Sequence, residues 1–385
     1  MKNIVIYGDG IIGKLTAVVL SDFFNVYLVT NKKSKSLDKK QARYFSINLL
    51  SKFMFLKYRL WDDIKKNSII GYDEILTWHE SLSEDILFRS RDVAFDKLGY
   101  IVKDLDIIES LDNLLSVKKN IFKLDSGDSD RIDNINTIFN IKSDHVTRDF
   151  LNHHPCRYNN IAYDQKALVL NLIMTKDINE NIALQRFEKN QIQGMLPISN
   201  NQYNLIWSAN SSFVDELQGY SNTQILNLLN KNFKGKVGEI ADISPPITFP
   251  LTGFNSTKYI LDNFVLIGGA AHSIHPMAGL GLNMGIQDIY FLQKSIKVEG
   301  SIDDALSSYE RSCIINNNRF FRTINFLMRF FTSGQTSNIV RSKSLRIFNK
   351  NKFLKDKVIK IATGLDVLKS ESKDQYCKPS YQQHQ

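Results

Sequence analysis

The chain has 385 residues, of which 43% are hydrophobic, 11% aromatic and 23% charged. This balance is typical of a protein with a large buried core, so it excludes a disordered or fibrous chain and predicts two domains, or one α/β unit with an inserted lobe. Three scattered cysteines are too few for a disulfide framework or a cysteine-rich zinc site. Without a secretory leader or an apolar run of about 18 residues, we expect a cytoplasmic protein that does not span a membrane.

The first elements along the chain predict a β-turn-α-β unit. Residues 3–7 form an apolar run typical of a strand buried on both faces, residues 14–24 have helical spacing, and residues 25–30 indicate a second strand. The turn between the first strand and the helix has a G-x-G-x-x-G pattern, which permits a tight bend and close approach of the backbone to a pyrophosphate. This pattern favours dinucleotide binding over a purely steric role for its glycines, which are Gly8, Gly10 and Gly13.

The middle of the chain alternates between helical and sheet patterns. We expect residues 44–61 to be helical, residues 72–95 to be mainly sheet and residues 98–115 to be helical again, followed by a strand at 138–141. Short apolar runs between residues 158 and 207 predict a largely antiparallel sheet. That sheet is the expected second lobe.

A second glycine-rich stretch follows a predicted strand at residues 264–267. It begins with Gly268-Gly-Ala-Ala-His272 and continues through a loop to a helix starting near Leu282, whose N–H groups are suited to an anionic or polar ring edge. His275 lies three residues after His272, but no acidic residue occurs between positions 268 and 287, so the pair is too small for a metal site. We therefore favour packing or loop ordering over a base or a metal ligand for both histidines.

Together these motifs resemble the ubiquinone-biosynthesis hydroxylases, a branch of the class A FAD-dependent aromatic monooxygenases. The resemblance extends over nearly the whole chain. Beyond the glycine-rich stretches it includes Arg43, Leu98-Gly-Tyr100, Tyr163-Asp-Gln-Lys-Ala167, Gln185-Arg-Phe187, Leu196-Pro-Ile198, Ile206-Trp-Ser208 and Phe249-Pro-Leu251.

The resemblance implies an α/β fold like that of p-hydroxybenzoate hydroxylase. In such a fold a Rossmann-like FAD-binding domain holds an inserted, mainly antiparallel β substrate domain, and here a helical tail would follow. The expected FAD-binding domain covers residues 1–70, 96–155 and 256–338, and the expected substrate domain covers residues 71–95 and 156–255. Residues 339–385 form the expected tail.

The resemblance also implies a reaction. NAD(P)H would reduce FAD, O₂ would be captured as a flavin C4a-hydroperoxide, and oxygen would pass to the aromatic ring of a polyprenyl phenol in ubiquinone biosynthesis. Since the cofactor supplies this chemistry, the protein needs neither a metal nor a nucleophile triad, and no residue is assigned as catalytic. Other proteins of ubiquinone biosynthesis are possible partners.

The residues implied to bind the cofactor fall in three groups. The pyrophosphate would lie at the first glycine turn, and Arg43 would contact the ribose or phosphate side of FAD. Gly268 and Gly269 would contact the ribityl chain. The residues implied to line the isoalloxazine are Pro276, Gly279, Gly281, Leu282, Asn283 and Met284.

The chain departs from the family pattern at several places. Gly269 replaces a carboxylate and Leu280 replaces a glutamine. Thr30 or Asn31 stands where the second strand usually ends in an acid. The family's mid-chain Asp-Gly, usually followed by Ser and Arg, would fall near residues 140–148, where only Arg148 is retained. Losing two hydrogen bonds to charged groups would weaken FAD binding by roughly two to four powers of ten. The alternative function is therefore a non-catalytic homologue, either an accessory subunit or a lipid-quinone-binding protein; a flavin reductase or halogenase of this fold is less favoured.

The C-terminal region holds most of the net charge of +9. Residues 339–360 contain eight Lys or Arg and one acidic residue, Asp356, with apolar residues interspersed. This pattern favours peripheral contact with the anionic inner face of a membrane over a merely solvated helix. Nucleic-acid binding is disfavoured, because no reading module accompanies the charge.

Overall fold

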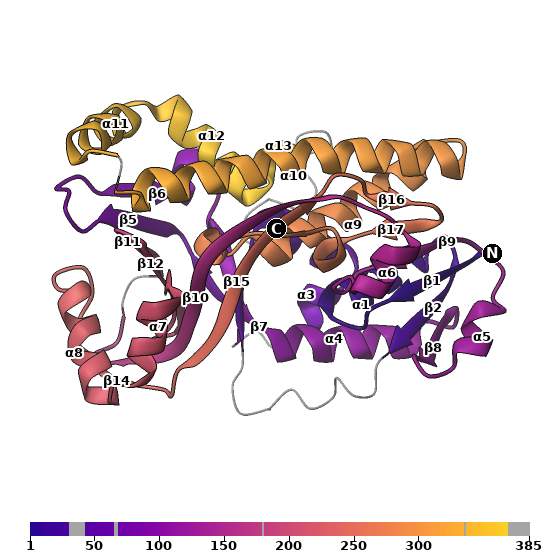
Figure 1. Cartoon of the computed structure of the whole chain (residues 1–385), viewed down its shortest axis with the longest axis horizontal. Coiled ribbons are helices and arrows are strands. Elements are labelled where there is room, and N and C mark those ends of the chain that lie inside the picture. Colours follow the sequence, from indigo (N-terminus) through magenta and orange to yellow (C-terminus); the bar gives the residue numbers. More distant parts are fainter. Residues whose placement is uncertain (31–42, 65–67, 179–180, 335, 369–385) are drawn as a thin grey trace, which may run out of the picture.

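The computed structural model describes residues 1–30, 43–64, 68–178, 181–334 and 336–368. Figure 1 shows three parts: a lobe with a parallel sheet at the right, a lobe with an antiparallel sheet at the left, and a layer of C-terminal helices at the top. The long strands β10 and β15 run between the two lobes. This arrangement confirms the predicted fold class.

The parallel sheet contains the first glycine turn. β1 pairs in parallel with β2 on one side and β9 on the other, and β17 pairs in parallel with β9. The central residues of β1 are at most 1% exposed, which explains their continuous apolar run. In sheet order the strands are β16 (Ile260–Leu261), β17 (Phe264–Leu266), β9 (Thr137–Lys142), β1 (Asn3–Tyr7), β2 (Asn25–Thr30) and β8 (Ile121–Asp125).

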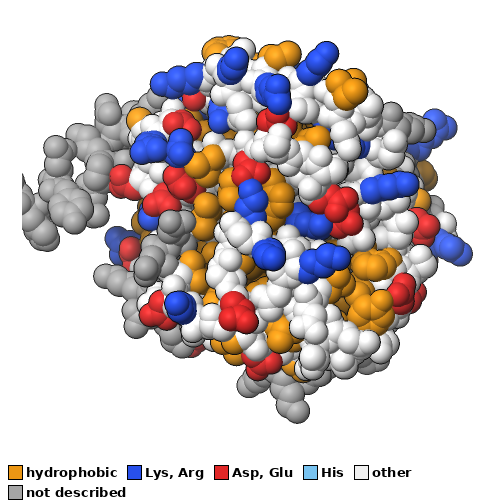
Figure 2. Space-filling model, turned by 90° about the vertical axis from the view of Figure 1, so that its left-hand side faces the viewer, with side chains coloured by type: hydrophobic (Ala, Val, Ile, Leu, Met, Phe, Trp, Pro, Cys, Tyr) orange, Lys and Arg blue, Asp and Glu red, His pale blue; other side chains and the backbone are white. Residues whose placement is uncertain are grey.

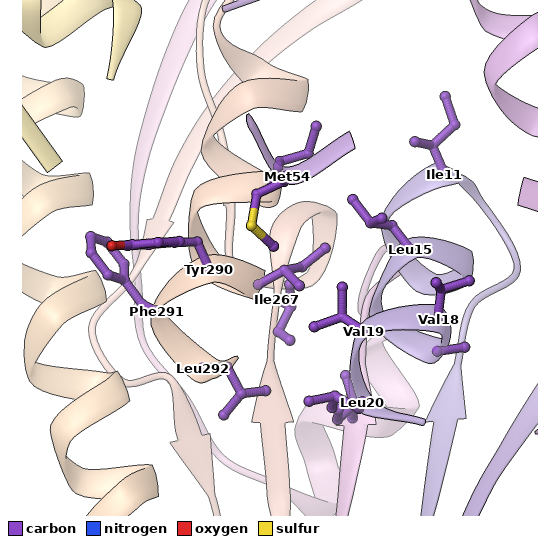
Figure 3. Packing of buried hydrophobic residues seen from close by; sticks show 14 of the residues in the cluster. Ile11, Leu15, Val18, Val19, Leu20, Met54, Ile267, Tyr290, Phe291 and Leu292 are labelled. Carbon is purple, nitrogen blue, oxygen red and sulfur yellow. The ribbon is translucent and has the colours of Figure 1, made fainter. Parts of the chain in front are cut away.

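Helices α1 (Ile11–Leu20) and α9 (Gly281–Val298) pack against each other beside this sheet. Figure 3 shows Leu15 and Val19 of α1 pointing toward Ile267 and Leu292. Ile267 directly follows β17, and Leu292 belongs to α9. All four side chains are fully buried. Since burying such a side chain stabilises the fold by about 1.5–3 kcal/mol, this core fixes the two helix N-termini relative to each other. The neighbouring helices are α2 (Leu49–Lys57), α3 (Leu60–Asp63) and α4 (Asp104–Val117).

The second lobe is the predicted antiparallel sheet, with one parallel pairing between β11 and β5. Its core includes Trp207, which is buried and donates a hydrogen bond from Nε1 to Oε1 of Gln191 at 3.0 Å. Helices α7 (Ser211–Gln218) and α8 (Asn222–Asn232) pack on this core. In sheet order the strands are β18 (His272–Ser273), β15 (Ile247–Ser256), β10 (Tyr158–Met174), β13 (Gln202–Asn210), β12 (Gln191–Ser199), β11 (Ile182–Glu188), β5 (Glu74–His79) and β6 (Ile86–Arg89), and β14 (Ile240–Ile243) pairs with β10.

A small antiparallel sheet corrects two of the predicted helices. Residues 44–61 and 98–115 each begin with a strand before the helix starts: β3 (Tyr44–Ile47) and β7 (Gly99–Lys103) pair with each other, and β4 (Ile70–Tyr72) pairs with β7. The helical interpretation was wrong at these positions because the pairing joins segments more than 50 residues apart, which local periodicity does not reveal.

The C-terminal helices form a layer on the outside of the molecule. α10 (Ile302–Thr332) packs along α9, and α11 (Asn338–Lys350), α12 (Lys352–Thr363) and α13 (Leu365–Leu368) follow it. Leu345 and Ile359 of this layer are at most 4% exposed, so the helices are docked on the body of the protein. Among helices in the described residues, none is both long and apolar enough to cross a membrane. The short elements not yet named are α5 (Ser129–Asp133), α6 (Arg148–His153), η3 (Ser90–Val93), η4 (Gly268–Ala270) and η5 (Pro276–Ala278).

Candidate cofactor site

The first glycine turn joins β1 to α1 and leaves backbone exposed at its tip. Gly8 has a φ of +115°, and a Cβ on Gly13 would lie 1.8 Å from the carbonyl oxygen of Gly8, so neither position accepts a larger residue without a shift. A Cβ on Gly10 would meet nothing within 4 Å. Gly10 precedes α1 without a side-chain cap, and the first turn of α1 has no acidic residue. These N–H groups and the helix dipole are suited to bind an anion.

The second glycine-rich loop has the same character. It runs from η4 through η5 to the start of α9 at Gly281. Gly268 and Gly279 have φ values of +57° and +59°, in the left-handed region that favours glycine. A Cβ on Gly281 would meet nothing within 4 Å. Gly269 and Gly281 are exposed, whereas Pro276, Gly279 and Leu282 are half-buried.

Two residues bring the loops together. A Cβ on Gly268 would lie 3.0 Å from the side chain of Ile12, and one on Gly285 would lie 2.7 Å from it, so Ile12 of the first turn packs directly on the second loop. Ser143 follows β9 and is adjacent to both loops: its Oγ donates to the carbonyl oxygen of Tyr7 at 3.1 Å, and its own carbonyl oxygen lies 3.5 Å from a Cβ built on Gly269. The two loops therefore meet at the carboxyl ends of β1, β9 and β17, where parallel α/β sheets bind their ligands.

A buried carboxylate holds the start of the second loop. Asp288 of α9 is fully buried, and its Oδ2 accepts hydrogen bonds from the N–H of Gly268 at 3.0 Å and from Nε2 of His272 at 2.7 Å. Its Oδ1 accepts from Nδ2 of Asn317 at 2.8 Å. Burial, and then the negative charge of Asp288, raise the pKa of the Cys313 thiol well above its usual range. The sequence interpretation of His272 as a loop-ordering residue agrees with these contacts, although Asp288 itself was missed.

Asn283 connects the same loop to the segment after Arg43. Its Oδ1 accepts from the N–H of Asn48 at 2.9 Å and from Oγ of Ser51 at 2.8 Å, while its Nδ2 donates to the carbonyl oxygens of Ser46 at 2.7 Å and Gly279 at 3.0 Å. Every polar position of this amide is thus bonded within the protein. Asn283 therefore orders the loop from behind.

Two other predicted site residues lie at different depths. Met284 is 1% exposed and belongs to an apolar cluster with Phe320 and Ile324 of α10, so it packs beneath the loop. Arg43 lies at the surface before β3, where its side chain is 58% exposed and its Nε bonds to Oδ2 of Asp104 at 3.0 Å. Its side chain therefore remains accessible to solvent.

The structure shows what stands in place of the acid expected after the second strand, and it shows another acid beside the first glycine turn. The hydroxyl of Thr30 donates to the carbonyl oxygen of Leu124 at 3.1 Å, and Asn31 lies outside the described residues. Asp144, which the sequence interpretation passed over, follows β9 and lies beside Gly8, with its Cβ 3.0 Å from a Cβ built on that glycine. It is half exposed and pairs with Lys142 at 2.6 Å. Its place directly after a predicted strand was the signal that could have found it.

A neutral polar cluster separates the second loop from the antiparallel lobe. His275 is fully buried; its Nδ1 accepts from the N–H of Met277 at 3.1 Å, so its Nε2 donates to Oε1 of Gln165 at 3.0 Å. Burial lowers the pKa of His275 to about 4. The ring of Tyr163 contacts this imidazole edge to face, and the Tyr163 hydroxyl donates to Oδ1 of Asn325 at 3.1 Å. At neutral pH the cluster is thus held together by hydrogen bonds between uncharged groups.

The residues present fit a flavin dinucleotide in part. Two uncapped helix N-termini, and glycines whose missing Cβ atoms leave backbone open, form a cradle for a diphosphate and a flat ring. The carboxylate that would hold the ribityl hydroxyls is absent at Gly269. Within the part of the chain that the structure describes, no three His, Cys, Asp or Glu side chains are placed to hold a metal ion.

Comparison with known proteins agrees with this cradle. Residues 161–315 match the FAD binding domain family. The chain is 23% identical over 392 residues to 3-demethoxyubiquinol 3-hydroxylase of Escherichia coli, covering 94% of this chain and 98% of that protein. It is 24% identical to the ubiquinone biosynthesis monooxygenase of Dictyostelium discoideum, covering 95% and 92% of the two chains.

The chain is thus similar to the FAD-dependent ubiquinone hydroxylases over nearly its whole length. The family match indicates FAD as the cofactor. Solved structures show the same fold. A probable FAD-dependent monooxygenase from Pseudomonas aeruginosa superposes with a TM-score of 0.69 at 15% identity, over 90% of this chain and 99% of that one. p-Nitrophenol 4-monooxygenase from Pseudomonas putida gives 0.69 at 12% identity, over 94% and 99%.

Proposed function

We propose that this protein is a monooxygenase that hydroxylates the aromatic ring of a polyprenyl phenol in ubiquinone biosynthesis. The observation that supports this most is that the two glycine-rich loops meet beside the antiparallel lobe. The similarity to ubiquinone hydroxylases, which extends over nearly the full length of this chain and of each relative, also supports it. The balanced reaction replaces a ring C–H by C–OH: one O₂ supplies the oxygen, NAD(P)H supplies two electrons, and the second oxygen atom leaves as water.

In this proposal the protein positions and encloses the reactants. When bound, FAD accepts electrons from NAD(P)H and activates O₂. The N–H groups at the start of α1 would bind the diphosphate, and Gly269, Pro276, Gly279, Gly281 and Leu282 would contact the remainder of the cofactor. The neutral cluster around His275 would order the second loop from behind, because both nitrogens of this buried imidazole are bonded within the protein.

We also propose the domain boundaries expected from the sequence. The FAD-binding domain would combine residues 1–70, 96–155 and 256–338, because β1, β2, β8, β9 and β17 all belong to the parallel sheet. The substrate domain would combine residues 71–95 and 156–255. The pairing of β5 with β11 supports this division, since it places the first of these segments in the antiparallel lobe.

Absorbance spectroscopy of the purified protein tests the main proposal. We expect a flavin spectrum, present on purification or after adding FAD, that NAD(P)H bleaches faster when a prenylated phenol is present. Product analysis with a short-chain prenyl phenol should show one added oxygen atom, and labelled O₂ should supply it. A colourless protein that FAD cannot reconstitute would refute the proposal.

A second candidate is a non-catalytic lipid-quinone-binding homologue. It is favoured by the glycine at position 269 and by the use of the Thr30 hydroxyl within the sheet. The variant Gly269→Asp distinguishes the two functions, because a carboxylate there would add one or two charged hydrogen bonds, about 1.5–3 kcal/mol each. FAD affinity that rises at least tenfold, together with no turnover by the native protein, would favour the non-catalytic function.

We further propose that the C-terminal layer contacts an anionic membrane surface. Its outer side exposes large apolar residues among basic ones, and Figure 2 shows such side chains interspersed near the top of the face it displays. The exposed apolar residues are Ile315, Phe326, Ile339, Val340, Ile347, Phe353, Leu354 and Val358, and the exposed lysines of α11 and α12 are Lys343, Lys350, Lys352 and Lys357. Each basic residue near such a surface contributes about 1 kcal/mol of attraction.

Vesicle sedimentation tests the membrane contact. Deleting the chain after Thr336 would also remove Leu345 and Ile359 from the core, so point variants on the exposed side are better. The double variant Ile347→Ser/Phe353→Ser should lose most sedimentation with anionic vesicles while keeping its thermal stability. Unchanged sedimentation would refute the contact.

A further inference from the structure

A cavity of about 510 Å³ lies apart from the cofactor site, between α9, α10, α12 and α13. It is a partly open hollow, and one of its walls is α12, which belongs to the proposed membrane-facing layer. None of the residues assigned above to the cofactor lines it. Its lining therefore needs a separate explanation.

Four cations from three helices line this cavity. Lys294 comes from α9, Arg319 from α10, and Lys357 and Lys360 from α12. Leaving Lys294 aside, Arg319, Lys357 and Lys360 bring three positive charges around one hollow, and the lining supplies two carboxylates against them. The cavity is thus poised to accept an anion.

The two carboxylates carry further information. Oδ2 of Asp366 accepts from Nη1 of Arg319 at 3.0 Å, but its Oδ1 is buried without a hydrogen-bond partner. Oδ1 of Asp356 is buried without a partner as well. Buried carboxylate oxygens in native proteins are nearly always paired with a donor. A fitting occupant therefore combines an anionic group with hydrogen-bond donors.

The remaining wall of the cavity is apolar and reaches the surface. Phe291, Ile361 and Val367 lie inside, and Phe353 lines the cavity while its side chain is 73% exposed. A charged interior with an apolar edge on the membrane-facing layer matches a molecule whose polar head joins hydrocarbon chains.

We propose that this cavity binds the headgroup of an anionic glycerophospholipid whose phosphodiester carries free hydroxyl groups, as in phosphatidylglycerol. The phosphate binds Lys357, Lys360 and Arg319, and the headgroup hydroxyls donate to Asp356 and Asp366. Phe353 lies against the start of the acyl chains. This inference rests on the membrane contact proposed above and deepens it, because it assigns a lipid class and a binding site to that contact.

Sedimentation of the full-length protein with two kinds of vesicle tests the proposal. One kind contains phosphatidylcholine with phosphatidylglycerol, and the other contains phosphatidylcholine with oleate at matched surface charge, which lacks a phosphodiester headgroup. The native protein should bind the phosphatidylglycerol vesicles about tenfold more tightly, as expected for one or two charge-assisted hydrogen bonds.

Matched double variants locate the preference. Lys357→Gln/Lys360→Gln should reduce it to near unity, whereas Lys343→Gln/Lys350→Gln, which removes the same charge from exposed positions of α11, should weaken binding to both vesicles alike and keep the preference. Equal effects of the two variants would overturn the headgroup site and leave the membrane contact standing. Failure of the native protein to bind either vesicle would overturn both.

Two further measurements test the headgroup chemistry. Asp356→Ala should lower the ratio of phosphatidylglycerol to oleate binding about threefold, because it removes an acceptor for a headgroup hydroxyl. An unchanged or higher ratio would overturn that contact. Inorganic phosphate should not displace the native protein from phosphatidylglycerol vesicles at matched ionic strength; displacement would assign the cavity to free phosphate instead of a lipid.

Discussion

The two glycine-rich loops of the cofactor site are held in place by different means. The first is fixed by what its residues lack: Gly13 has no Cβ, and the carbonyl of Gly8 occupies the space where one would lie. The second is fixed by side chains behind it: Asp288 bonds to the N–H of Gly268, while Asn283 and His275 bond to groups 235 and 110 positions away. A loop held by close backbone contact depends on local sequence, whereas a loop held by buried polar contacts depends on the whole fold.

This difference explains how the second loop tolerates the loss of its family carboxylate. The N–H of Gly268 is bonded to Asp288, so the loop does not depend on a side chain at position 269 for its shape. The contacts that support the loop from beneath do not involve a side chain at position 269. Loop geometry and cofactor affinity can thus vary separately in this protein.

The largest effect is expected from removing the charge behind the second loop. Asp288→Asn should lower the free energy of unfolding by about 4 kcal/mol, because it leaves the donors of His272 and Asn317 without a buried anion. Urea denaturation measures this change. The matched control is Asp262→Asn, since Asp262 pairs with His154 at the same 2.7 Å but is 71% exposed. The control should change stability by less than about 1 kcal/mol; similar effects of the two variants would contradict the role given to Asp288.

The first loop should respond to a single methyl group. Gly13→Ala places a Cβ against backbone, which cannot rotate away, and should lower the free energy of unfolding by about 3 kcal/mol and abolish FAD binding. Gly10→Ala is the control, because its φ of −74° suits alanine and nothing lies within 4 Å of the added Cβ. It should leave urea denaturation unchanged and weaken FAD binding alone. Equal loss of stability in both variants would show that the turn is not held by close contact.

The polar support of the second loop should make stability depend on pH. The pKa of His275 is about 4 in the folded protein and near 6.5 in the unfolded chain, so between these values the unfolded state binds more protons. Stability therefore falls as the pH falls through this window, by about 2.5 kcal/mol near pH 4.5 from this group. Denaturation of the native protein and of His275→Gln at a series of pH values measures it. Parallel pH profiles would contradict the buried neutral state of His275.

The smallest effect on stability is expected at the exposed end of the second loop. Gly281 is the first residue of α9, and a Cβ there meets nothing within 4 Å, so Gly281→Ala should raise the free energy of unfolding by about 0.5 kcal/mol. Flavin titration should nevertheless show weaker FAD binding, because the added methyl group lies where the cofactor would approach. Unchanged FAD affinity would place the flavin away from this helix start.

Local patterns predicted the first loop and much of the two sheets. Strand, turn, helix and strand over residues 3–30 occur where the apolar periodicity and the glycine spacing indicated, and the antiparallel lobe follows its short apolar runs. The errors at residues 44–61 and 98–115 arose where a short strand pairs with a distant one. The C-terminal segment was correctly predicted to be helical, but its sequence pattern did not separate Leu345 and Ile359, which are buried, from Ile347 and Phe353, which are exposed.

Glycine spacing and apolar periodicity determined the supersecondary structure, because steric exclusion and strand burial act between residues close along the chain. Tertiary structure alone decided which polar groups meet. Asn283 bonds to Asn48 across 235 positions, and Arg319 of α10 reaches Asp366 of α13 beside a shared cavity. Amides, carboxylates and cations accept many partners, so only the packing of distant elements selects one of them and thereby shapes the cofactor loop and the cavity.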